Sequence, residues 1–73
     1  MKDRKITGLG EELRSRRLAA HLSQGDLEDR SGVPKARISR YENQHITPDL
    51  ATLIDLGEGL NTAPSTILKT VGL

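Results

Sequence analysis

The sequence predicts an all-α domain of four or five short helices, and three observations support this fold class. Apolar residues recur at spacings of three and four rather than two, which is the period of amphipathic helices. The chain has 73 residues, enough for one small domain, and Leu, Ile and Val make up 18 of them, enough for an aliphatic core. It contains no cysteine and only two histidines, so we expect neither a disulfide nor a structural zinc site.

The charge pattern divides the chain into a basic beginning and an acidic end. Residues 1–22 carry six Lys or Arg and three Asp or Glu, whereas residues 48–73 carry one Lys and three Asp or Glu. This asymmetry suits an anionic partner on one face, although ordinary scatter of surface charge explains it equally well. We expect residues 1–7 to form a flexible basic arm and residues 8–73 to form the folded domain. Neither a membrane span nor a secretory signal is recognisable, so the sequence predicts a cytoplasmic protein.

The first helix is expected over residues 8–21. Leu9, Leu13 and Ala20 fall on one apolar stripe, but Arg17 falls on the same stripe. A guanidinium that faces a core needs an acidic partner or must extend to solvent.

The second helix has clear signals at both ends and is expected over residues 24–31. Ser23 can accept a hydrogen bond from the backbone of Asp26, whose carboxylate can reach back to Ser23, as in a capping box. Gly32 can then end the helix because glycine tolerates a positive φ.

A third helix is expected over residues 34–43, with Pro34 as its first residue. Ile38 and Tyr41 give it an apolar side. Two short helices joined by a three-residue turn that starts with glycine are typical of a helix-turn-helix.

Two further helices complete the expected fold. Thr47 is the expected N-cap of the fourth helix and Pro48 its first residue. Gly57 and Gly59 lie inside this helix and are expected to cost about 1 kcal/mol each relative to alanine. A short fifth helix is expected over residues 64–71.

Taken in order, these residues resemble the Cro and phage-repressor family of helix-turn-helix regulators, also called the XRE type. The matching residues extend over about residues 9–69: Leu22-Ser23-Gln24, Leu27, Gly32-Val33, Ile38-Ser39-Arg40-Tyr41-Glu42-Asn43, Pro48, Leu53, Leu56, Leu60-Asn61 and Leu68. The resemblance implies a compact lambda-repressor-like fold. It also implies a sequence-specific transcriptional regulator of double-stranded DNA, most simply a repressor, that needs no cofactor.

The resemblance assigns roles to individual side chains. The helix at residues 34–43 would read the major groove through Lys35, Ala36, Arg37, Ser39 and Arg40. Contacts to DNA phosphates would come from Gln24, Asn43, His45 and Thr47. The chemistry of these residue types agrees, because arginine can bind guanine O6 and N7 together and alanine is small enough to meet a thymine methyl group.

Arg17 and Glu42 occupy positions that form a buried ion pair in some members of the family. That pairing would satisfy the arginine on the apolar stripe of the first helix. Their expected role is therefore structural.

The sequence departs from the family pattern at Glu28 and at Gln44. Glu28 replaces a usual alanine, so it should either splay the second and third helices or pair with Arg37 or Lys35. Gln44 replaces the usual glycine after the third helix, where a left-handed conformation would be strained. With Gly57 and Gly59, these departures suggest a less stable version of the fold.

A homodimer on a palindromic operator is expected, because one such module buries only about 600–1,000 Å² on DNA. Half-sites would lie about one helical turn apart. The dimer interface is expected at apolar residues left over near the end of the chain: Ile67, Leu68, Val71 and Leu73.

Two other function classes remain open at this point. The chain could be an antitoxin, which binds DNA and also a toxin protein, or an interaction module that has lost DNA binding. An enzyme is not expected, because His21 and His45 lack the paired carboxylates of a catalytic triad or a metal site.

Overall fold

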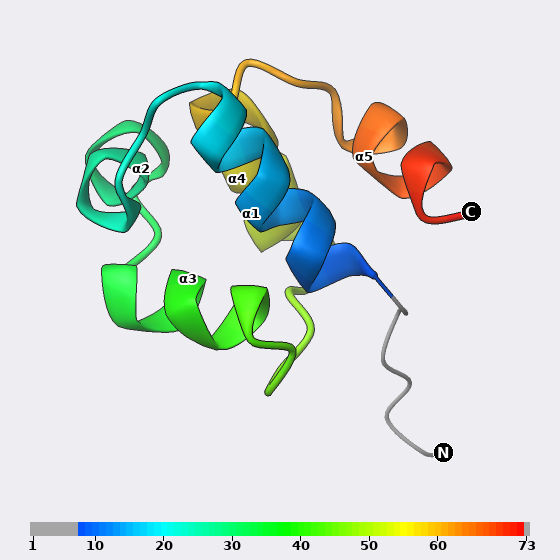
Figure 1. The fold of residues 1–73 in the computed structure, drawn as a ribbon, viewed down its shortest axis with the longest axis horizontal. Helices are drawn as coiled ribbons and strands as arrows, with labels where there is room; N and C mark the ends of the chain where they lie inside the picture. Colours follow the sequence, from blue (N-terminus) through cyan, green and yellow to red (C-terminus); the bar gives the residue numbers. More distant parts are fainter. Residues whose placement is uncertain (1–7, 73) are drawn as a thin grey trace.

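Five α-helices make up the computed structural model, which describes residues 8–72, and they confirm the predicted all-α class (Figure 1). The helices are α1 (Leu9–Ala19), α2 (Gln24–Ser31), α3 (Lys35–Glu42), α4 (Leu50–Gly59) and α5 (Pro64–Thr70). α2 packs against both α3 and α4, whereas α5 packs against α1 and α4. Residues 1–7, where we expected a basic arm, and Leu73 lie outside the described residues.

The core is aliphatic apart from one tyrosine ring, and every helix contributes to it. Its buried apolar residues are Leu9, Leu13, Leu27, Val33, Ile38, Tyr41, Leu53, Leu56, Leu60 and Ile67. The side chain of Ile67 is 0% exposed, so this residue is wrong as a dimer contact. The reason is that α5 turns this side chain inward against the helices on which it packs. Leu68 and Val71 are half-buried.

α2 has the bounds and the caps that its sequence predicted. Ser23 Oγ accepts a hydrogen bond from the Asp26 backbone N–H at 2.9 Å, and Asp26 Oδ2 accepts one from the Ser23 N–H at 2.9 Å. Gly32 ends the helix with a φ of 77°. Both end signals are local, which is why the sequence was sufficient to place this helix.

The ends of α1 and α4 differ from the sequence predictions. α1 ends at Ala19, before the predicted His21, because His21 takes a left-handed conformation (φ 60°) that reverses the chain. α4 begins after Asp49, which caps it by accepting a hydrogen bond from the Thr52 N–H at 2.8 Å. Thr47 and Pro48 belong instead to the loop between α3 and α4, so the prediction that they are the N-cap and first residue of α4 is wrong. Likewise, Pro34 is the N-cap of α3 rather than its first helical residue.

Three of the helices end in the same way, with a left-handed residue that is not glycine. These residues are His21, Gln44 and Asn61, with φ values of 60°, 60° and 55°. After α3, the His45 N–H donates to the Arg40 carbonyl and the Gln44 N–H to the Tyr41 carbonyl, which is the Schellman pattern. Gln44 therefore does occupy the strained position that the family gives to glycine.

Close packing explains three glycines that local rules treat as weak points. A Cβ at Gly59 would lie 2.9 Å from Leu27 Cδ1, and one at Gly57 would lie 2.6 Å from the Thr62 carbonyl oxygen. A Cβ at Gly10 would lie 2.3 Å from the Tyr41 carbonyl oxygen, where α1 meets α3. The expectation that Gly57 and Gly59 merely weaken α4 is therefore wrong, because a side chain at either position would collide with its neighbours.

Candidate nucleic-acid interface

The outer side of α3 carries three exposed cationic side chains, Lys35, Arg37 and Arg40. Ile38, Tyr41 and Glu42 face inward and are buried. Four of the five predicted base-contact residues are exposed: Lys35, Ala36, Arg37 and Arg40. The helix therefore separates one side that packs from another that is open to a ligand.

Ser39 differs from the other predicted base contacts because it is half-buried. Its Oγ accepts a hydrogen bond from Asn43 Nδ2 at 3.3 Å. Asn43, which follows the last residue of α3, is exposed.

The three cations on this side make no ion pair with any residue in the range 8–72. Glu28 is exposed and does not pair with Lys35 or Arg37, so that predicted partnership is wrong. α2 packs against α4 at Gly59, whereas Glu28 lies on the solvent-exposed side of α2. Within the described residues, Lys35, Arg37 and Arg40 thus form no direct ion pair, although the charge of Arg37 is near enough to the Asp49 carboxylate to lower the pKa of that group.

Behind this surface, Arg17 and Glu42 form a bidentate ion pair between α1 and α3. Arg17 Nε donates to Glu42 Oε2 at 2.7 Å, and Arg17 Nη2 donates to Oε1 at 2.9 Å. Nη1 donates to the Leu22 carbonyl at 2.8 Å. Each residue is 7% exposed. The hydrogen bond to Glu42 raises the pKa of the Arg17 guanidinium.

Gln24 links the buried pair to the surface. It is the first residue of α2 and is half-buried, and its Nε2 donates to Glu42 Oε1 at 3.1 Å. Glu42 Oε1 therefore accepts from both Arg17 and Gln24. This contact fixes the direction of the Gln24 amide at the N-terminus of α2, where backbone N–H groups favour an anion.

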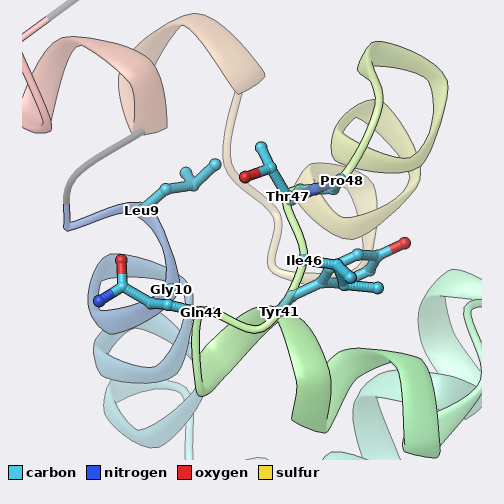
Figure 2. A pocket seen from close by; sticks show the side chains of 7 residues that line it. All are labelled: Leu9, Gly10, Tyr41, Gln44, Ile46, Thr47 and Pro48. Atoms are coloured by element: carbon cyan, nitrogen blue, oxygen red, sulfur yellow. The ribbon is translucent and has the colours of Figure 1, made fainter. Parts of the chain in front are cut away.

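The other predicted phosphate contacts lie on the loop that follows α3. His45 and Thr47 are both exposed. Thr47 also lines a small pocket where this loop passes the start of α1, together with Leu9, Gly10, Tyr41, Gln44, Ile46 and Pro48 (Figure 2). No charged side chain lines that pocket.

Ile46 is a surface residue that sequence reasoning missed. It packs against the core from the α3–α4 loop and also lines an open hollow beside α3 with Pro34, Ala36, Arg37 and Arg40. The only signal in the sequence was a single apolar residue within a polar loop. Its position beside α3 comes from the chain reversal at Gln44.

The described residues offer neither a metal site nor a membrane segment. Within residues 8–72, no group of three or more His, Cys, Asp or Glu side chains is placed to hold a metal ion. No helix in this range has the length and apolar character needed to cross a bilayer. The main chemical property of the interface is its positive charge.

Comparison with known proteins gives one family and one group of structures. A sequence profile described as helix-turn-helix matches residues 13–67. None of the curated protein sequences matches the chain. The restriction-modification controller protein C.AhdI from Aeromonas hydrophila is 26% identical and superposes with a TM-score of 0.80, covering 85% of this chain and 94% of that one. The wild-type restriction-modification controller protein C.Esp1396I is 17% identical and superposes with a TM-score of 0.82, covering 96% of this chain and 91% of that one.

Proposed function

The chain belongs to the XRE-type helix-turn-helix family of DNA-binding transcriptional regulators, and we propose that it reads a specific DNA sequence with α3 in the major groove. The resemblance seen in the sequence is thereby confirmed at the level of the family. The observation that carries the proposal is the outer side of α3. Lys35, Arg37 and Arg40 are exposed there, and none of them forms a direct ion pair with the described residues.

The dimensions and chemistry of α3 suit this role. An α-helix with its side chains is about 10–12 Å wide, and the major groove of B-DNA is about 12 Å wide. In the proposed complex Arg40 would bind guanine O6 and N7, and Lys35, Ala36, Arg37 and Ser39 would contact neighbouring bases. Gln24 and the N-terminus of α2 would hold a phosphate, with Asn43, His45 and Thr47 as further backbone contacts.

We further propose a homodimer on a palindromic operator. A single module of this size buries too little DNA surface for tight binding, and two modules roughly double it. Ile67 is excluded from the dimer contact by its burial. Two exposed apolar side chains on α4, Leu50 (67% exposed) and Ile54 (41% exposed), support a contact between copies. The half-buried Leu68 and Val71, in and just after α5, remain the candidates from the predicted set.

The name of C.AhdI suggests a more specific role, control of a restriction-modification system. For this chain we propose repression by promoter occlusion as the basic mechanism and control of such a gene pair as the first setting to test. The antitoxin role stays as the alternative. One observation distinguishes the two roles, because an antitoxin would co-purify with a toxin protein encoded beside it.

Selection of bound sequences from random double-stranded DNA tests the proposal directly. We expect an enriched palindrome whose half-sites lie about one helical turn apart. Affinity for that site should fall by orders of magnitude between low and moderate salt, because phosphate contacts release counter-ions. The matched control is the variant in which Lys35, Arg37 and Arg40 are all alanine, which should fold normally and lose binding. Absence of any enriched sequence, with affinity that ignores salt, would contradict the proposal.

A further inference from the structure

The hollow beside α3 combines an apolar floor with two flanking cations. Pro34, Ala36 and Ile46 supply the apolar surface, and Arg37 and Arg40 border it. Ile46 packs against the core, so this part of the floor is held in place before any ligand arrives. Both arginines are exposed and make no ion pair in the described structure.

We infer that this hollow receives the C5-methyl group of a pyrimidine in the major groove, and the inference rests on the proposed DNA-binding function. In the major groove, thymine presents a C5-methyl group beside its O4 acceptor, whereas guanine, adenine and cytosine present polar edges. The floor made by Pro34, Ala36 and Ile46 has no side-chain donor or acceptor to offer a polar edge. An apolar group is therefore the occupant that fits it.

The arginines make DNA a better occupant than an apolar peptide. A guanidinium can bind guanine O6 and N7 together or can hold a phosphate oxygen. Arg37 and Arg40 line the same hollow, so each can hold an acceptor or negatively charged group of the DNA next to the apolar floor. The hollow as a whole then selects a methylated pyrimidine that lies next to a guanine or a phosphate.

Two bases carry the required methyl group, thymine and 5-methylcytosine. Their shared chemistry is a methyl group on C5, and they differ in the group on C4. A site that holds the methyl group would bind DNA with thymine more tightly than DNA with deoxyuridine. It would also bind 5-methylcytosine more tightly than cytosine at the same position.

Single-base replacement in the selected operator tests the inference. Each thymine is replaced in turn by deoxyuridine, each cytosine is replaced by 5-methylcytosine, and affinity is measured by fluorescence anisotropy. Burial of one methyl group should change the affinity by about fourfold per half-site. We expect this change at one pyrimidine position in each half-site.

The protein variants connect that position to the hollow. Ile46→Ala removes part of the floor, and Ala36→Ser adds a hydroxyl group without touching the core. In either variant the ratio of the two affinities, methylated over unmethylated, should fall toward one. Leu18→Ala, at an exposed position on α1, is the matched control and should keep the wild-type ratio. Each ratio compares two DNAs bound by the same protein preparation. Partial unfolding of a variant therefore lowers both apparent affinities by the same factor and leaves their ratio unchanged.

Three results would overturn the inference. The first is that a C5-methyl group changes the affinity at no pyrimidine position, a result that would leave the proposed DNA-binding function standing. A ratio that is equal in the wild type, Ile46→Ala and Ala36→Ser would overturn the inference as well, because the methyl group would then be read elsewhere. Failure to enrich any DNA sequence would remove the proposed function itself, and the inference with it.

Discussion

The two sides of α3 carry charge in opposite ways. On the inner side, Glu42 is buried and accepts hydrogen bonds from Arg17 and Gln24, so its charge is satisfied within the protein. On the outer side, Arg37 and Arg40 are exposed and form no direct ion pair with the described residues. A buried charge is costly to leave unpaired, whereas an exposed one costs little. Changes on the inner side should therefore act on stability, and changes on the outer side should act on binding.

The largest expected effect comes from breaking the buried pair. Glu42→Ala leaves the Arg17 guanidinium buried without a counter-charge, and it should lower the free energy of unfolding by roughly 3–5 kcal/mol. Urea denaturation followed by circular dichroism measures this. Glu58→Ala, at an exposed position on α4, is the matched control and should change stability by no more than about 0.5 kcal/mol. Similar losses in the two variants would show that the pair is not the structural element described above.

The contact between α1 and α3 depends on the absence of a side chain at Gly10. Gly10→Ala would place a Cβ 2.3 Å from the Tyr41 carbonyl oxygen, and backbone cannot move aside easily. We expect a loss of roughly 1–3 kcal/mol from overpacking. Gly25→Ala is the matched control, because its Cβ would lie 3.7 Å from the nearest atom. That change should stabilise the protein by about 0.5–1 kcal/mol, since alanine favours helix. Thermal melts of both variants would reveal the difference in sign, and a shared sign would refute the packing argument.

On the outer side, Arg40→Ala should leave stability unchanged and weaken binding. We expect a loss of about 1–3 kcal/mol on the selected operator, with relaxed preference at one base pair. The measurement is affinity for the operator and for its single-base variants, with a denaturation curve as control for folding. Equal weakening on operator and random DNA would mean that Arg40 contacts the DNA backbone only.

The smallest expected effect is the pH dependence of the helix caps. Hydrogen bonds from Ser23 lower the pKa of Asp26, and the Thr52 N–H lowers the pKa of Asp49, with a smaller contribution from the charge of Arg37. A carboxylate with a lowered folded-state pKa contributes its full stabilisation above the unfolded-state pKa and loses it as the pH falls through the folded-state pKa.

Stability should therefore decline as the pH falls below about 4, where free aspartate takes up its proton. Asp26→Asn and Asp49→Asn should each make that decline shallower in urea denaturation series at several pH values. Asp29→Asn, which removes an exposed carboxylate that makes no cap hydrogen bond in the described structure, is the matched control. A decline that is unchanged in both cap variants would assign the acid sensitivity to other groups.

Two helix starts show where local signals suffice and where they do not. The start of α2 was predictable because Ser23 and Asp26 satisfy each other within four residues. The start of α4 was not, because Thr47 and Asp49 are both good N-caps and the sequence does not rank them. The path of the loop over the start of α1 decides between them, since it places Thr47 and Pro48 at the pocket there (Figure 2).

The sequence by itself determined the helical period, the caps of α2, the helix-turn-helix and the exposed cations of α3. Each of these depends on residues close together along the chain. Only the tertiary structure decided that Gly10 must lack a side chain, that Ile67 is in the core and that Ile46 lies beside α3. Such features depend on distances between segments far apart in the sequence. The periodicity of a single helix indicates which side is apolar but not which neighbouring helix that side will pack against.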